Sequence, residues 1–178
     1  MKKKIYKLTE SQIQNIVKKT AAIVKENLEN EITGYSREDL IKLLYDNLED
    51  ICQKLYDDTR ENPGEFNDGF YGKDNEFYYA FDVPENPDMD KPSIWFDYEY
   101  NVTYYDDHDA FGEPWAIIKN GYIYDGWSEE YDIMDMQELK KAIKLIENDI
   151  EKGLEDACDA VKDAWAEEET YDSLRYYY

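Results

Sequence analysis

Residues 94–104 read IWFDYEYNVTY, and this stretch decides the fold. Every second residue from Ile94 to Tyr104 is aromatic or aliphatic, whereas the residues between them are mostly polar. A period of two residues is typical of a β-strand with one buried and one exposed face. The stretch therefore predicts a long strand of an antiparallel sheet, because such a sheet can leave one face open to water.

The flanking sequence predicts partner strands within residues 61–134. Residues 77–83 read as a strand, and residues 115–119 and 122–127 flank Asn120-Gly121. Asn-Gly is the dipeptide that type I′ turns prefer, because both of its positions require positive φ. We therefore expect a hairpin there and about four antiparallel strands in all. Glycines and a proline predict a loop over 62–74.

Residues 1–60 predict a helical hairpin. The first helix begins at Thr9 and the second at Ser36, each with a polar residue three positions later that completes a capping motif. Gly34 separates the two helices, and the second shows a leucine-rich apolar stripe. This region is therefore expected to form two packed helices before the sheet.

Residues 135–168 predict one long helix, since apolar side chains recur every three or four positions. Gly153 lies within it and costs about 1 kcal/mol relative to alanine, which indicates close packing. Residues 169–178 show no pattern. The fold class expected for the chain is α+β, as a single domain over 1–178 with the long C-terminal helix packed on the sheet.

The charge of the chain is unevenly distributed. The 178 residues include 43 acidic and 20 basic side chains, which give a net charge of −23 at pH 7. Residues 1–60 hold 11 of each sign, so the whole excess belongs to residues 61–178. Such a surface repels phosphate, and direct binding of nucleic acid is not expected. Because residues 61–135 also contain 19 of the 28 aromatic residues, acidic and aromatic surface are interleaved.

The sequence favours a cytoplasmic protein without membrane contact. No stretch approaches the roughly 20 apolar residues of a membrane helix, and the lysines at the start of the chain precede no apolar segment of a signal peptide. Cys52 and Cys158 both fall among helical apolar positions. They are therefore expected to be buried thiols and not a disulfide.

Carboxylates recur at regular spacing in two places. In the long helix they lie four residues apart and predict an acidic ridge roughly 30 Å long; the residues are Glu147, Glu151, Glu155, Asp159, Asp163 and Glu167. In the long strand, Asp97 and Glu99 share one face about 7 Å apart. These spacings approach those of phosphates along a nucleic-acid strand.

This pattern leads to the hypothesis of a nucleic-acid mimic, in which carboxylates and tyrosines occupy the binding groove of a basic protein. Complementary charge speeds encounter and suppresses wrong partners, and tyrosine adds rigid contact area. The residues expected to bind the partner are Asp97, Glu99, Asp106, Asp107, Asp109, Glu151, Glu155, Asp159, Tyr98, Tyr104 and Tyr105. For the tyrosines the alternative is a core position, because Tyr98 and Tyr104 share a face with Ile94.

In overall character the chain resembles the small acidic inhibitors that phages deploy against restriction and CRISPR nucleases, some of which are DNA mimics. Residues 7–18, KLTESQIQNIVK, also resemble an opening seen in small proteins of phages and mobile elements of gut bacteria. The resemblance implies an anti-CRISPR or anti-restriction protein in the cytoplasm of a bacterial host. Such inhibitors share no common motif, so the resemblance assigns no residue a role.

Two other function classes stay open. The first is a phage structural or protein-interaction module without nucleic-acid mimicry, in which the aromatic sheet face binds a protein. The second is a glycosidase-like hydrolase, because paired carboxylates among aromatic side chains can act on sugars. With so many acidic residues such pairs arise by chance, and no catalytic motif is present. The expectation is therefore a protein that is not an enzyme and has no catalytic residue.

The chain contains one histidine, within Asp106-Asp107-His108-Asp109. This segment lacks the glycine and the terminal glutamate of a calcium loop, and a single histidine without paired cysteines does not make an ordinary zinc site. We therefore interpret it as a polar loop and expect neither a metal nor a cofactor.

Overall fold

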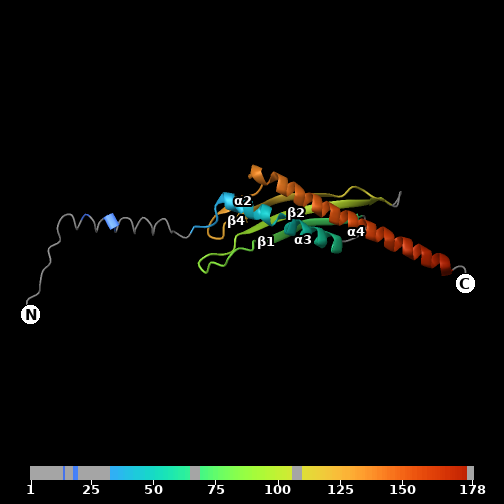
Figure 1. Ribbon diagram of the computed structural model, residues 1–178. Coiled ribbons are helices and arrows are strands. Elements are labelled where there is room, and N and C mark those ends of the chain that lie inside the picture. Colours follow the sequence, from blue (N-terminus) through green and yellow to red (C-terminus); the bar gives the residue numbers. More distant parts are fainter. Residues whose placement is uncertain (1–13, 15–17, 20–32, 65–68, 106–109, 176–178) are drawn as a thin grey trace, which may run out of the picture. The chain divides into compact units, whose positions relative to one another are not determined.

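The computed structural model describes residues 14, 18–19, 33–64, 69–105 and 110–175, and for 168–175 the backbone only (Figure 1). The chain divides into two compact units, Met1–Thr33 and Gly34–Tyr178, where the sequence pattern indicated one domain. The helix expected from Thr9 lies almost wholly outside the described residues. The α+β architecture is confirmed within the second unit.

The second expected helix forms two helices. Ser36 caps α2 (Arg37–Asp46) by accepting a hydrogen bond from the Asp39 N–H at 3.2 Å, as the capping motif predicts. Helix α2 ends at Asn47, whose side-chain amide donates a hydrogen bond to the Leu43 carbonyl at 2.8 Å and whose backbone leaves helical geometry. The next helix is α3 (Leu48–Glu61). Leu40 and Ile51, one on each helix, are fully buried, so both helices face the core.

Among the described residues the sheet has five antiparallel strands, in the order β1-β2-β4-β5 with β3 paired to β2. Their bounds are Gly69–Ala80 for β1, Ser93–Tyr105 for β2, Ala110–Phe111 for β3, Trp115–Tyr124 for β4 and Glu130–Asp132 for β5. The even-numbered residues of β2 from Ile94 to Val102 are buried, which confirms the alternation in the sequence.

The expected hairpin at Asn120-Gly121 is wrong, because both residues lie inside the continuous strand β4. Gly121 pairs with Phe96, whereas Ile118 pairs with Tyr98, so Lys119 is the extra residue of a β-bulge. A Cβ at Gly121 would lie 2.5 Å from the Trp95 carbonyl oxygen. The glycine therefore permits close approach of β2 and does not make a turn.

The loop expected over 62–74 is also partly wrong, since β1 begins at Gly69. Gly72 lies in β1 beneath the ring of Tyr100, where a Cβ would be 2.3 Å from the ring carbon Cζ. Asp74 has φ of 56° and lies in a second irregularity, between Gly72 and Asn75. Gly69 and Gly72 are therefore strand residues, and Gly72 leaves room for the buried ring of Tyr100.

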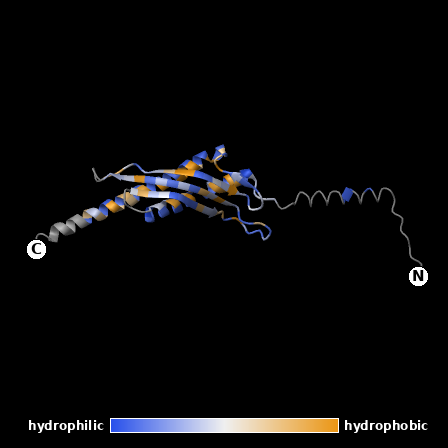
Figure 2. Cartoon of the chain, turned by 180° about the vertical axis from the view of Figure 1, so that it is seen from behind, coloured by the Kyte–Doolittle hydropathy of each residue, from blue (hydrophilic) through white to orange (hydrophobic). Residues whose placement is uncertain are grey.

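A 3-10 turn, Gln137–Leu139, precedes the long helix α4 (Lys140–Arg175), which packs on α3 and along β4 and β2. The two helices are close at Gly153, where a Cβ would lie 2.1 Å from Thr59 Oγ1, so the expected close packing is confirmed. The described helices of this unit all lie on one face of the sheet, as Figures 1 and 2 show from opposite sides. We call the opposite face the outer face.

Candidate functional site

The outer face carries aromatic and acidic side chains in rows that run across the strands. The strand register places Trp95 of β2 between Tyr78 of β1 and Tyr122 of β4. Tyr78 is 64% exposed on the edge strand β1, and Tyr122 is 41% exposed on β4, which lies between β2 and β5. We call Tyr78, Trp95 and Tyr122 the aromatic row.

Carboxylates flank the aromatic row on both sides. Glu76 and Asp97 face each other across β1 and β2 in the next row along the strands. On β5, Asp132 pairs with Tyr122, and Glu130 pairs with Tyr124. Like charges directly opposite each other destabilise a sheet, so the pair of Glu76 and Asp97 is a cost that the fold itself does not explain.

The connection between β4 and β5 is fixed by a buried carboxylate. Asp125 is 4% exposed, and its Oδ1 accepts hydrogen bonds from three successive backbone N–H groups. The donors are Trp127, Ser128 and Glu129, at 2.7, 2.8 and 3.0 Å. This turn places β5, with its two carboxylates, beside β4.

A shallow pocket of about 370 Å³ opens on the outer face along the side of the aromatic row that faces Ser93 and Tyr124. We call it the aromatic pocket; its lining residues are Tyr78, Ser93, Trp95, Tyr122, Tyr124 and Glu130. The rings of Trp95 and Tyr122 stack with centroids 5.0 Å apart and planes 16° apart. Burial, followed by the carboxylates of Asp90 and Asp125, raises the pKa of Tyr124.

The structure separates the predicted partner-binding residues. Asp97 and Glu99 lie on the outer face as expected, but Glu99 pairs with Lys119 at 2.6 Å. Glu155 and Asp159 lie exposed on α4, on the other side of the sheet, and Asp159 pairs with Lys162 at 3.0 Å. The strand and helix carboxylates therefore do not form one continuous surface.

The three tyrosines differ in exposure. Tyr98 is 4% exposed and belongs to the core, which corrects its assignment as a partner-binding residue. Tyr104 is half-buried and contacts the rings of Phe111 and Trp165, whereas Tyr105 is exposed at the end of β2. Asp106, Asp107 and Asp109 lie outside the described residues.

Two members of the predicted acidic ridge have a structural role that the sequence did not indicate. Glu147 and Glu151 turn toward the part of β4 that β5 does not pair, and each carboxylate accepts a backbone N–H of that strand. The donors are Ile118, at 3.1 Å from Glu147, and Ala116, at 3.2 Å from Glu151. We call these two glutamates the edge pair. Lys144 lies 3.5 and 3.9 Å from their carboxylates.

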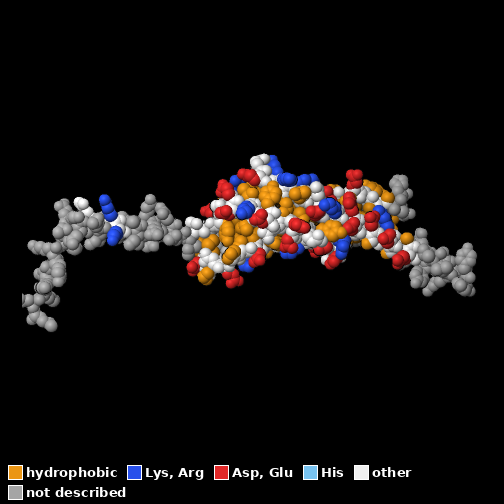
Figure 3. All heavy atoms as spheres, in the orientation of Figure 1, with side chains coloured by type: hydrophobic (Ala, Val, Ile, Leu, Met, Phe, Trp, Pro, Cys, Tyr) orange, Lys and Arg blue, Asp and Glu red, His pale blue; other side chains and the backbone are white. Residues whose placement is uncertain are grey.

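The helix side of the sheet shows mixed charge. Figure 3 shows acidic, basic and apolar side chains interspersed over its coloured part. Arg37 pairs with Glu138 at 2.8 Å, one of several such ion pairs on the helices. This side is therefore less suited than the outer face to attract a cationic partner.

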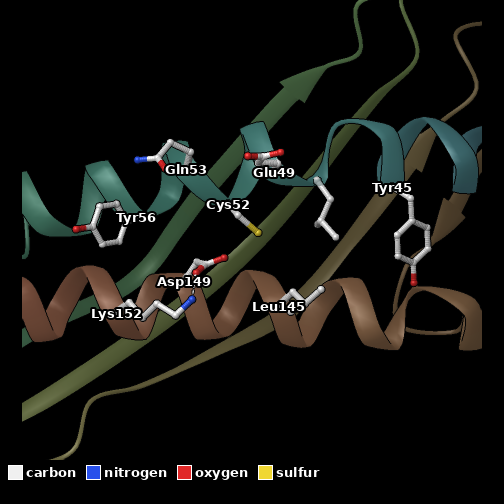
Figure 4. A pocket seen from close by; sticks show the side chains of 9 residues that line it. Tyr45, Glu49, Cys52, Gln53, Tyr56, Leu145, Asp149 and Lys152 are labelled. Carbon is white, nitrogen blue, oxygen red and sulfur yellow. Dashed lines mark hydrogen bonds and ion pairs between the residues drawn. The ribbon is translucent and has the colours of Figure 1, made fainter.

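A second pocket, of about 550 Å³, lies between α3 and α4, with Tyr45, Tyr56 and Leu145 among its lining residues (Figure 4). Cys52 points into it, but burial and a hydrogen bond to Asp149 raise the pKa of the thiol to about 12. A thiol with this pKa is protonated at neutral pH and is a poor nucleophile. The thiol of Cys52 is therefore not activated as a nucleophile.

Within the ranges that the structure describes, no group of three or more metal-ligating side chains comes together, and Asp106 to Asp109 lie outside those ranges. No helix in the described part of the chain is long and apolar enough to span a bilayer. Comparisons with protein-family models, curated proteins and solved structures find no significant match to the chain.

Proposed function

We propose that the chain is a non-enzymatic inhibitor that occupies the nucleic-acid-binding groove of a basic protein, such as a nuclease of a bacterial defence system. The observation that carries the proposal is the aromatic row flanked by four carboxylates on a sheet face that no described helix covers. Carboxylates attract a cationic groove over a distance of about 10 Å at 0.1 M salt. The exposed rings supply contact area once the partner is bound.

The uncompensated charge on the outer face supports this proposal. Among the described residues Lys119 lies on this face and neutralises Glu99, and Lys91 pairs with Asp82 beyond the ends of β1 and β2. Glu76, Asp97 and Glu130 take part in no ion pair of the described chain. Their repulsion costs stability in the free protein and is relieved when a cationic partner binds.

The second candidate is a protein-interaction module without mimicry. It is favoured by the other end of the outer face, where Trp115 and Ile117 of β4 and Tyr71 of β1 are about half exposed. An apolar patch of this kind typically marks a protein contact. Binding through it would depend weakly on salt and would leave the nucleic acid of the partner in place.

Competition with DNA tests the proposal. The full chain is added to fluorescent duplex DNA bound to a panel of restriction and CRISPR nucleases, and displacement is followed by anisotropy between about 50 and 300 mM salt. We expect displacement from at least one nuclease, weakening about tenfold or more over this range. Displacement from none, or displacement indifferent to salt, would contradict mimicry.

Two variants with equal charge change identify the surface. The outer-face variant combines Glu76→Gln, Asp97→Asn and Glu130→Gln, and the control combines Glu38→Gln, Asp46→Asn and Glu61→Gln on the helices. We expect the outer-face variant to compete at least about tenfold more weakly, which corresponds to about 1.4 kcal/mol, and the control to compete as the wild type does. A loss confined to Glu155→Gln with Asp159→Asn would instead place the interface on α4.

A further inference from the structure

We propose that the aromatic pocket is a binding site for one arginine side chain of the basic partner. The inference rests on the proposed function and names the chemistry that this site would recognise. Four rings and one carboxylate border the pocket, with the buried Ser93 among its lining residues. Its volume of about 370 Å³ admits a single long side chain.

The ring arrangement leaves one side of Trp95 open to a ligand. Trp95 stacks on Tyr122, its partner on β4. Its partner on β1 is Tyr78, which is 64% exposed and makes no ring contact with Trp95 among the described residues. A flat group can therefore enter beside Trp95 without displacing a packed ring.

The charge around the pocket selects a cation. Glu130 lines the pocket, Asp132 lies opposite Tyr122, and Asp97 follows Trp95 on the same face of β2. The faces of aromatic rings also carry negative potential, and tryptophan is the strongest cation acceptor among them. No lysine or arginine lines the pocket, so an external cation meets no internal competitor there.

The shape of the site favours guanidinium over ammonium. Guanidinium is planar and weakly hydrated, stacks on aromatic rings, and donates two parallel hydrogen bonds to a carboxylate. Glu130 supplies that carboxylate at the border of the rings. Lysine carries a compact, strongly hydrated charge that gains less from the rings.

The test is an NMR titration of the nitrogen-15-labelled full chain with two peptides whose termini are capped and therefore uncharged. They are acetyl-(Gly-Arg)₃-amide and acetyl-(Gly-Lys)₃-amide. The indole signal of Trp95 is assigned with Trp95→Phe. We expect the arginine peptide to shift this signal most among the indoles and to bind about fivefold more tightly than the lysine peptide. Equal affinity for the two peptides would overturn the assignment to arginine.

Matched variants distinguish binding in the aromatic pocket from nonspecific attraction to the acidic outer face. Tyr78→Ala and Glu130→Gln are each expected to weaken the arginine peptide about fivefold, whereas Tyr71→Ala and Glu99→Gln, at the other end of the same face, leave it within about twofold. Urea denaturation checks that each variant is folded, and Glu130→Gln decides the outcome if Tyr78→Ala is not. If the two pairs of variants weaken peptide binding equally, the pocket is not the arginine site. The proposed function would still stand if the wild-type chain displaces DNA.

Discussion

Gly153 shows how one residue sets the distance between two helices. It lies on α4 against α3, and a Cβ there would lie 2.1 Å from Thr59 Oγ1 and 2.6 Å from the Tyr56 carbonyl oxygen. We expect Gly153→Ala to lower the free energy of unfolding by about 1 to 3 kcal/mol, because overpacking outweighs the gain of about 1 kcal/mol in helix propensity. Urea denaturation followed by circular dichroism measures the change.

The sign of this change is the decisive result. In an exposed helix the same substitution would stabilise the protein. A variant of Gly153→Ala that is more stable than the wild type would therefore mean that α3 and α4 are not in contact at this point. The contact also bears on the candidate site, because α3 and α4 pack together and α4 covers the buried face of the sheet whose outer face carries that site.

At the scale of single elements, the edge pair protects the open part of β4. β5 pairs only with residues 122–124 of β4, and the carboxylates of Glu147 and Glu151 bind two N–H groups of the remaining edge. Exposed strand edges promote association with other chains. The double variant Glu147→Ala with Glu151→Ala is therefore expected to lose about 1 to 3 kcal/mol of stability and to self-associate.

Light scattering after size exclusion measures the association, and urea denaturation the stability. The control is Glu155→Ala, an exposed position on the same helix and the same ridge, which we expect to stay within about 0.5 kcal/mol of the wild type. A double variant that behaves like this control would show that the edge pair contributes no more than surface charge.

The elements also show where sequence reasoning succeeds. Strong periodicity fixes the main strand β2 and the long helix α4, because each pattern persists over many residues and agrees with one buried face. Local rules were less reliable: Asn120-Gly121 has the composition of a turn but continues β4 beside the bulge at Lys119. The reason is that β2 extends past this point and pairs with β4 on both sides of it. Asn47 breaks a helix that its apolar pattern alone would continue.

At the scale of the whole molecule, the sequence located the acidic excess but not the faces that carry it. The ridge on α4 followed from spacing, yet tertiary packing turns Glu147 and Glu151 inward to β4 and leaves Glu155 and Asp159 outside. The aromatic row was not predicted, since it depends on which residues of three strands lie opposite one another. The alternation within a strand indicates which of its residues face outward. Which outward residues of neighbouring strands lie opposite one another is known only from the folded structure.

The folded chain also holds weak acids in their protonated form. Burial raises the pKa of Cys52 to about 12 and that of Cys158 to about 11. Burial, with a hydrogen bond to Asp50, raises that of Tyr79 to about 12. Burial also raises the pKa of Tyr98. The ordinary values are 9.0 for the thiols and 10.0 for the phenols, and these apply to the unfolded chain.

We therefore expect stability to fall as pH rises above about 9, because the unfolded chain releases these protons at lower pH than the folded chain. Each group contributes a slope of up to about 1.4 kcal/mol per pH unit between its two pKa values, and its contribution is fully present below the unfolded value. Urea denaturation at several pH values between about 8 and 11 measures the slope. Tyr98→Phe is expected to reduce it above about pH 10, and Tyr71→Phe, which removes an exposed hydroxyl from β1, is the control. Stability that is constant over this range would contradict the burial of these groups.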